Sequence, residues 1–252
     1  MSDPISMPYA LTIAGSDPSG GAGVQIDLEV FRRCGVKGLS VITSVSAQTD
    51  QKFLAVYGLP KKIVFQQYKI LTDSYPIQAI KTGLFLRKDI VSLFLKRIGR
   101  QENVQLVIDP LMVSSTGASL LQLKAYKELN RLISIAHVVT PNLGEASSLA
   151  GFRVHNLETM KMAAQEIYAG GCLNVIIKGG HLDGRPLDLL YDGSQFTPFE
   201  RDRISGVRFH GLGCRFSAAL TAYLAKGSSV RAAFLAAEDL MTSMIQELSN
   251  VR

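Results

Sequence analysis

The feature that most constrains the fold of this chain is a repeated alternation of short apolar runs with longer segments of helical period. The runs are rich in β-branched residues and lie at 9–14, 39–45, 78–82, 104–109, 137–140 and 174–178. Strands that are separated by helices pair in parallel, because each crossover returns the chain to the same end of the sheet. The sequence therefore predicts an α/β fold around a mostly parallel sheet.

The last part of the chain adds two elements to this pattern. Residues 187–191 and 195–199 are two apolar strands separated by Asp192, Gly193 and Ser194, which predicts a hairpin at a sheet edge. Residues 230–248 carry apolar side chains at three- and four-residue spacing, which is typical of a helix packed on a core. No repeat or composition shift marks a boundary, so we expect one domain over residues 1–252.

Composition excludes several classes of protein. Hydrophobic residues make up 47% of the 252 residues and charged residues 19%, which is typical of a globular chain. The net charge of +6 comes from scattered Lys and Arg, which favours an anionic small ligand over nucleic acid. No signal peptide or membrane-length apolar run is present, and the three cysteines form no CxxC pair. We expect a cytoplasmic protein without disulfides or a zinc site.

A glycine-rich loop follows the first predicted strand. Residues 15–23 hold four glycines, which permit close backbone approach, and a helix is expected to begin around Ala22. The loop matches neither GxxxxGK[ST] nor GxGxxG, and a simple strand-to-helix turn explains it about as well as a ligand site does. Asp27 follows on the helix, where its carboxylate could point back toward a pocket at the strand end.

A second loop, at residues 208–213, leads into an amphipathic helix. Backbone amides at such a helix start stabilise an anion or the charge that develops on a transferring phosphoryl group. Cys214 lies at this positive end, where a thiol ionises more easily. The alternative for Cys214 is a small buried residue at a helix start, and Cys34 and Cys172 are assigned that role.

Polar side chains also follow several other predicted strands. Asp109 and Glu145 offer carboxylates that suit Mg²⁺, and Lys178 offers a point charge for a phosphate. Ligands of open α/β sheets bind outside the carboxyl ends of the strands. We therefore expect these groups to converge at one edge of the sheet.

Together these segments resemble the hydroxymethylpyrimidine and phosphomethylpyrimidine kinases of thiamine synthesis, a branch of the ribokinase-like family. The resemblance runs from about residue 10 to about residue 226, and its specific motifs are ALTIAGSDPSGGAG at 10–23, SVITSVSAQT at 40–49, DPLMV at 109–113, TPNLGEA at 140–146, IKGGHLDG at 177–184 and HGLGCRFSAAL at 210–220. It implies a three-layer α/β/α sandwich, ATP and Mg²⁺ as cofactors, a small pyrimidine substrate and a homodimer.

The resemblance also implies roles for individual residues. It suggests a pyrimidine pocket lined by Gly15, Ala22, Asp27, Gln48, Leu84 and Val113. The Gln48 amide can donate and accept at once, which suits the paired edge of an aminopyrimidine. For the reaction it suggests Cys214 as the base and an anion hole formed by the backbone amides of Gly211, Leu212, Gly213 and Cys214. It also suggests that ATP binds Asn142, Lys178 and Arg215. The metal ion would be held by Asp109 and Glu145.

The chain departs from the family pattern in the second loop. The family has threonine at the positions of Leu212 and Arg215, so this chain has GLGCR in place of GTGCT. Arg215 adds a charge beside Cys214 that could bind phosphate or favour the thiolate, and we hypothesise a shift toward the already phosphorylated substrate. Ala118 also stands where the family often has aspartate.

Two other functions are consistent with these residues. Ribokinase-like relatives with a cysteine at this position can accept vitamin B6, whose ring also carries a hydroxymethyl group, so pyridoxal kinase is one alternative. The altered loop at 211–215 motivates the other, a catalytically weak pyrimidine-binding protein. The sequence does not distinguish one phosphorylation step from two.

Overall fold

One sheet runs through the whole chain. The computed structural model describes residues 7–49, 51–98, 103–112, 120–180, 182, 184–203 and 210–250. Within these residues the sheet has the order β3-β2-β1-β4-β5-β6-β7-β8-β9. The strands are β1 (Tyr9–Ser16), β2 (Lys37–Gln48), β3 (Phe53–Gly58), β4 (Ile77–Thr82), β5 (Gln105–Ile108), β6 (Val138–Val139), β7 (Val175–Gly179), β8 (Leu187–Tyr191) and β9 (Phe196–Glu200).

The central strands are parallel and the edges are antiparallel. β2, β1, β4, β5, β6 and β7 pair in parallel, whereas β3 pairs antiparallel with β2, and β8 and β9 form an antiparallel extension of β7. The predicted edge hairpin is therefore confirmed. β3 was not predicted, because none of its residues is buried and its pattern lacks an apolar run on one face.

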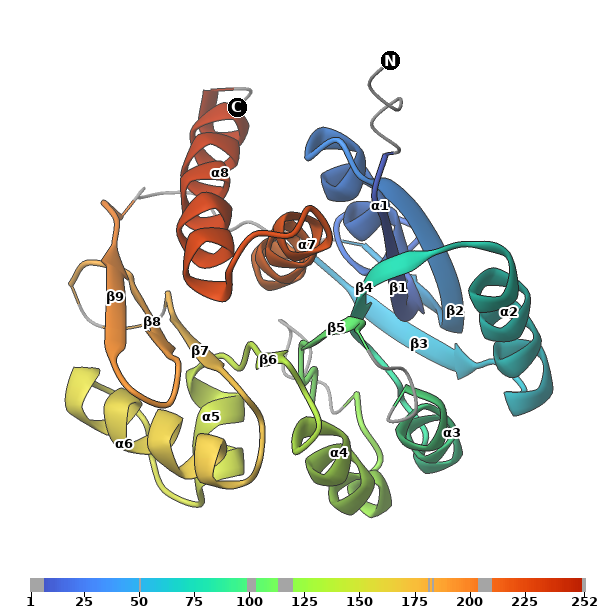
Figure 1. Ribbon diagram of the computed structural model, residues 1–252, viewed down its shortest axis with the longest axis horizontal. Helices are drawn as coiled ribbons and strands as arrows, with labels where there is room; N and C mark the ends of the chain where they lie inside the picture. Colours follow the sequence, from blue (N-terminus) through green and yellow to red (C-terminus); the bar gives the residue numbers. More distant parts are fainter. Residues whose placement is uncertain are drawn as a thin grey trace.

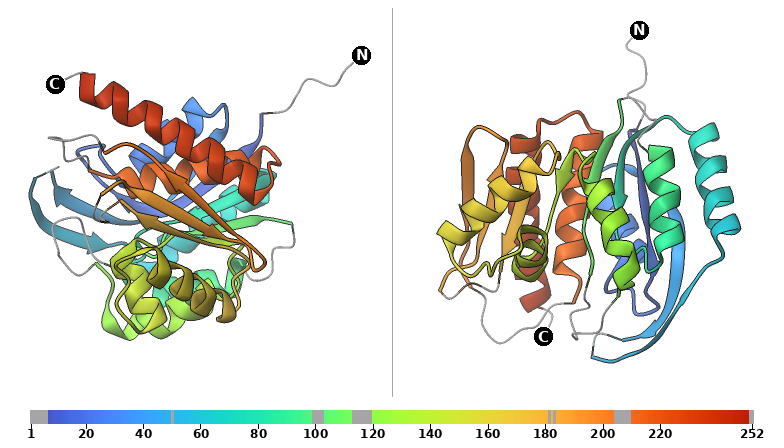
Figure 2. Two further views of the ribbon diagram at one scale, coloured as in Figure 1. Left: turned by 90° about the vertical axis from the view of Figure 1, so that its left-hand side faces the viewer. Right: turned by 90° about the horizontal axis from the view of Figure 1, so that it is seen from below.

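Helices cover both faces of the sheet, as Figures 1 and 2 show. The helices α1, α7 and α8 pack on one face, and α2 to α6 lie on the other. Their bounds are α1 (Gly23–Arg33), α2 (Lys61–Ser74), α3 (Lys88–Ile98), the short 3₁₀ helix η1 (Leu123–Ala125), α4 (Tyr126–Ile133), α5 (Leu143–Ala150), α6 (Leu157–Ala169), α7 (Leu212–Ala225) and α8 (Val230–Asn250). The predicted three-layer α/β/α fold is confirmed.

Each face of the sheet has its own core because successive strand residues point to opposite sides. Leu11 and Ile13 of β1 belong to the cluster under α2 to α6, whereas Ala10 belongs to the cluster under α1, α7 and α8. Alanines such as Ala79 and Ala219 are frequent in the second cluster, which lets α7 lie close to the central strands. This packing brings the start of α7 to the sheet.

None of the helices in the described part of the chain combines the length and the apolar character that crossing a bilayer requires.

Candidate active site

A cavity of about 690 Å³ opens where the central strands end. The carboxyl ends of β1, β4, β5, β6 and β7 meet there, together with β2 and the start of α7, as expected for an open α/β sheet. Of the residues predicted for the site, those that line this cavity are Gly15, Ala22, Gln48, Leu84, Asp109, Asn142, Glu145, Lys178, Gly211, Leu212, Gly213 and Cys214. Val113 lies outside the described residues.

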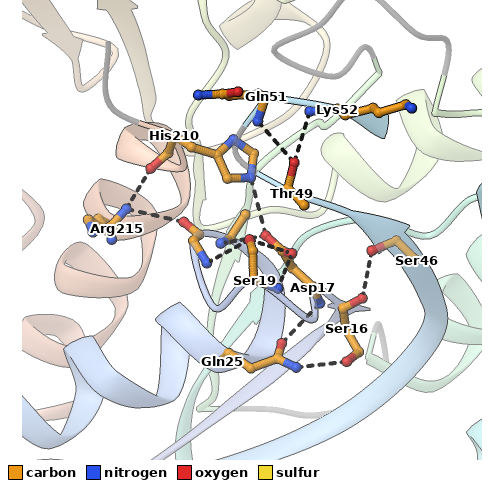
Figure 3. Close-up of polar contacts among 12 residues, drawn as sticks. Ser16, Asp17, Ser19, Gln25, Ser46, Thr49, Gln51, Lys52, His210 and Arg215 are labelled. Carbon is orange, nitrogen blue, oxygen red and sulfur yellow. Dashed lines mark hydrogen bonds and ion pairs between the residues drawn. The ribbon is translucent and has the colours of Figure 1, made fainter. Parts of the chain in front are cut away.

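Asp17 organises the glycine-rich loop. Its carboxylate accepts hydrogen bonds from the Ser19 and Ala22 amides, both at 2.9 Å, and from the Ser19 hydroxyl at 2.8 Å. His210 Nε2 lies 3.2 Å from the same carboxylate, so the loop after β1 is tied to the loop before α7 (Figure 3). Burial acts to raise the pKa of Asp17, but hydrogen bonds from Ser19, Gln48 and His210 prevail and lower it.

Gly211 makes the junction between the two loops possible. It precedes α7 with φ at 76°, in the left-handed region, and a Cβ there would come within 1.9 Å of the Gly21 carbonyl oxygen. Only glycine fits such an approach. The first hydrogen bond within the helix is donated by Arg215 N to Gly211 O, at 2.9 Å. The preceding amides of α7 begin the helix at the cavity, where they can bind an anion.

An ion pair lies beside the start of α7. Lys178 Nζ is 3.0 Å from Asp109 Oδ1, and Asp109 Oδ2 accepts a hydrogen bond of 3.1 Å from the Ser217 hydroxyl. A Cβ on Gly213 would come 3.0 Å from Lys178 Nζ, so the ammonium group lies against the first turn of α7. Burial acts to lower the pKa of Lys178, but Asp109 and Glu145 raise it above the ordinary value. Lys178 therefore stays cationic.

Glu145 and Asn142 form a capping box at the start of α5. Glu145 N donates to Asn142 Oδ1 and Asn142 N donates to Glu145 Oε2, both at 2.9 Å. Glu145 Oε1 is buried and has no hydrogen-bond partner among the described residues. Burial raises the pKa of Glu145 to about 7, with Lys178 opposing and Asp109 adding to the rise. The free oxygen leaves this carboxylate able to bind a further group.

Carboxylates for a metal ion are present, but they form no complete site by themselves. Among the described residues no three His, Cys, Asp or Glu side chains gather closely enough to hold an ion. Mg²⁺ is usually held by one or two carboxylates together with waters and substrate phosphates, however. Asp109 and the unpartnered oxygen of Glu145 fit that partial set of ligands.

Cys214 lines the cavity from the first turn of α7 and is almost completely buried. Burial raises the pKa of its thiol to about 11, while the Lys81 ammonium and the Gly23 amide act to lower it. The expectation that the helix start makes this thiol more acidic is therefore wrong. Loss of water around the sulfur outweighs the nearby positive groups.

The structure does not place Asp27 at the wall of the cavity, where the sequence had predicted it. The Asp27 carboxylate is fully buried. Asp27 Oδ2 accepts hydrogen bonds from Lys81 Nζ at 2.9 Å and from the Thr12 hydroxyl at 2.6 Å. The side chain points inward because Lys81, whose ammonium group is also fully buried, requires a counter-charge there. Asp27 thus acts on the cavity only through Lys81, which lines it.

Arg215 is likewise directed away from the cavity. Its Nη1 donates to the Gly21 carbonyl at 3.1 Å and to the His210 carbonyl at 2.6 Å (Figure 3), and the residue does not line the cavity. The guanidinium joins the two loops in place of facing a phosphate, so the predicted contact with ATP is not supported. The hydrogen bonds to carbonyl groups of both loops explain this orientation.

Several cavity residues escaped the sequence analysis: Asp17, Ser44, Ser46, Lys81, Asp188 and Arg201. Lys81 was detectable, because a lysine inside an apolar strand must find a buried partner. Arg201 contacts Asp188 Oδ2 at 3.3 Å and Glu238 Oε2 at 2.5 Å, which links β8 to α8. Met241 and Ile245 of the predicted core stripe also reach the cavity, so that helix does more than pack on the sheet.

Comparison with known proteins places the chain in a family. Residues 17–252 match the family model described as phosphomethylpyrimidine kinase. The chain belongs to the phosphomethylpyrimidine kinase family. A relative in Bacillus subtilis named hydroxymethylpyrimidine/phosphomethylpyrimidine kinase is 37% identical over 96% of this chain and 90% of its own length.

Three further proteins show how far the likeness extends. The pyridoxine kinase of Bacillus subtilis is 38% identical over 96% of this chain and 92% of its own length. The crystal structure of phosphomethylpyrimidine kinase from Clostridium difficile matches with a TM-score of 0.84 and 36% identity, over 94% of this chain and 99% of that one. The chain spans only 49% of a bifunctional relative named ThiED, from Geobacter sulfurreducens.

Proposed function

We propose that this chain is an ATP-dependent kinase that phosphorylates the hydroxymethyl group of 4-amino-5-hydroxymethyl-2-methylpyrimidine, and the phosphate of its monophosphate, in thiamine biosynthesis. The observation that carries this proposal is the meeting of two unlike sets of residues in one cavity. Ser44, Ser46 and Gln48 of β2 offer polar groups to a ring, while Lys178 and the start of α7 offer positive charge to phosphates.

In the proposed reaction the substrate oxygen attacks the γ-phosphorus of ATP. The bond from that phosphorus to the bridging oxygen breaks, and ADP leaves with the electron pair. Lys178 and the amides of residues 211–214 stabilise the charge that develops on the transferred group. Asn142 adds polar groups at the same wall for ATP. Positioning and charge neutralisation supply most of the rate, as is general for phosphoryl transfer.

Mg²⁺ is part of the proposal. Asp109 and Glu145 would hold it, and the bound ion would neutralise charge on the ATP phosphates. The support is the unpartnered Glu145 Oε1 and the position of both carboxylates at the end of the sheet that carries Lys178. Asp109 already contacts Lys178, so these two residues also keep each other oriented.

Cys214 is the proposed acceptor of the hydroxyl proton. Its raised pKa, about 11, leaves the thiol largely protonated near neutral pH. If the thiolate is the active form of the base, its fraction rises tenfold for each unit of increase in pH, as long as the pH stays below the pKa. We therefore expect kcat to rise with pH from 7 to 9, and a Cys214→Ala variant to lose both the rate and this dependence. A flat profile in the parent chain would contradict this role.

Phosphorylation of pyridoxal is a second candidate, favoured by the similarity to the pyridoxine kinase of Bacillus subtilis. A catalytically weak binding protein is a third, motivated by Leu212 in the second loop. One assay separates the three. The chain is incubated with Mg·ATP and, separately, the pyrimidine, its monophosphate and pyridoxal, and ADP formation is followed with Cys214→Ala as the control.

Turnover with either pyrimidine, lost in the variant, supports the proposed kinase. Turnover with pyridoxal alone would move the function to vitamin B6. Tight binding of a pyrimidine without any turnover would favour the binding protein.

A homodimer belongs to the same proposal. Val45, Leu54 and Tyr57 expose 43%, 67% and 66% of their surface on the ribbon of β2 and β3, and a second copy would cover them. Light scattering coupled to gel filtration tests the dimer.

The continuous sheet supports a single domain over residues 1–252, which predicts one cooperative unfolding transition. The three free cysteines support a cytoplasmic setting.

A further inference from the structure

Ser44 differs from the polar residues around it. Its side-chain oxygen is buried at the cavity wall, the residue is only 1% exposed, and among the described residues the hydroxyl has no hydrogen-bond partner. A buried hydroxyl without a partner costs free energy, so such groups are rare unless a ligand or water satisfies them. The Ser44 hydroxyl therefore lacks a hydrogen-bond partner that a ligand in the cavity could provide.

The neighbouring hydroxyls on β2 are already satisfied within the protein. Ser46 donates to the Ser16 carbonyl at 2.9 Å (Figure 3), and Thr43 donates to the Leu84 carbonyl at 2.5 Å. Ser44, Ser46 and Gln48 occupy alternate positions on the strand and all line the cavity. Of the two serines in this row, Ser44 is the one that keeps its hydrogen bond available.

Gly15 and Leu84 lie beside Ser44 at the cavity wall. A Cβ on Gly15 would come 2.8 Å from Ser44 Oγ and 3.4 Å from Leu84 Cδ2. Because Gly15 carries no side chain, its backbone can lie close to the Ser44 hydroxyl and to Leu84 without a clash. An aromatic ring that packs on Leu84 would place an in-plane nitrogen near the hydroxyl.

We propose that Ser44 determines specificity for the ring of the substrate by donating a hydrogen bond to a ring nitrogen. This inference rests on the proposed function and adds a contact separate from Gln48. The hydroxyl can rotate to donate, and the nitrogen lone pair of an aminopyrimidine lies in the ring plane. Ser44 does not touch the reacting phosphate, so it acts on binding and not on the chemical step.

The test compares Ser44→Ala with Ser40→Ala, a matched change on the same strand outside the cavity. With the hydroxymethylpyrimidine as substrate, we expect the KM of Ser44→Ala to rise about threefold to tenfold, the range for one neutral hydrogen bond, with kcat changed less than twofold. Ser40→Ala should keep the parent KM. A Ser44→Ala variant with the parent KM would overturn the inference.

Two further readouts separate recognition from a structural role. The ligand-free Ser44→Ala variant should melt at or above the temperature of the parent, because no hydrogen bond is lost; a lower melting temperature together with an unchanged KM would show a structural residue and overturn the inference. The parent should also prefer the pyrimidine to an analogue whose ring nitrogens are replaced by CH, and Ser44→Ala should reduce that preference by the same threefold to tenfold.

Binding and turnover of the two pyrimidines are measured first with the parent chain. If calorimetry and turnover detect no interaction of the parent with either pyrimidine, the proposed function fails and the inference fails with it. If the parent turns over the pyrimidine and Ser44→Ala does so with equal KM and an unaltered preference for the ring nitrogens, only the inference fails.

Discussion

Two buried lysine–aspartate pairs of this protein have the same chemistry and different surroundings. Lys81 and Asp27 lie 2.9 Å apart with neither side chain exposed to solvent; Lys81 lines the cavity, whereas Asp27 does not. Lys178 and Asp109 lie 3.0 Å apart with side-chain exposures of 13% and 2%, at the cavity wall. The first pair is sealed, and the second keeps one face open. The comparison teaches that access, and not the ion pair itself, separates a structural charge from one that can meet a ligand.

Removing one partner of the sealed pair should have the largest effect. Asp27→Asn leaves the Lys81 ammonium buried without a counter-charge, so we expect the free energy of unfolding to fall by about 3–5 kcal/mol. Urea denaturation measures the loss, with Asp73→Asn, an exposed partner of Lys69, as a control for the same substitution. A loss below 1 kcal/mol would mean that the sealed pair carries no special structural role.

Breaking the open pair should act on catalysis more than on folding. We expect Lys178→Met to reduce kcat about 10²- to 10³-fold, the range for losing one group that stabilises transition-state charge. The melting temperature should change less than in Asp27→Asn, because Asp109 lines the cavity and keeps its hydrogen bond from the Ser217 hydroxyl. Single-turnover kinetics with Mg·ATP measure the rate. A variant that loses stability but keeps its rate would reverse our assignment of the two pairs.

Replacing the sealed pair as a unit should be nearly neutral. The double variant Asp27→Leu and Lys81→Met removes both charges, and we expect its free energy of unfolding to lie within about 1–2 kcal/mol of the parent. Comparison with each single variant in a double-mutant cycle isolates the coupling between the two residues. Additive losses would indicate that the two side chains do not stabilise each other.

A third cation, the partly buried Arg201, shows the same contrast on a smaller scale. Arg201 faces two carboxylates, Asp188 and Glu238, so negative charge is in excess. Burial, followed by the Asp188 carboxylate, raises the pKa of Glu238 well above its usual value, although Arg201 opposes this. The folded state then holds a proton that the unfolded chain releases above about pH 4.5, so stability falls as the pH rises.

Glu238→Gln removes this titration. We expect the free energy of unfolding of the variant to decline less steeply than that of the parent between pH 5 and pH 8, by about 1 kcal/mol or less for each pH unit. Denaturant titrations across that range measure the slope. Parallel curves for the two proteins would argue that Glu238 stays ionised beside Arg201.

The sequence by itself determined most of the strands, the edge hairpin, the last helix and two loops that line the cavity. The strand at Tyr9–Ser16, the edge hairpin and the last helix follow from period and turn residues, which are local properties. Gly211 and the amides after it were recognisable because a helix start binds anions whatever surrounds it. β3 escaped prediction because an exposed strand lacks a buried pattern.

Tertiary structure alone decided which way the polar side chains point and what they titrate against. Asp27 turned toward Lys81, 54 residues away along the chain, and Arg215 toward the Gly21 carbonyl, 194 residues away. Cys214 sits at a helix start, yet burial against distant segments raises its pKa. The physical reason is common to all three. Pattern and propensity act over a few residues, whereas desolvation and ion pairing depend on every segment that packs around a charge.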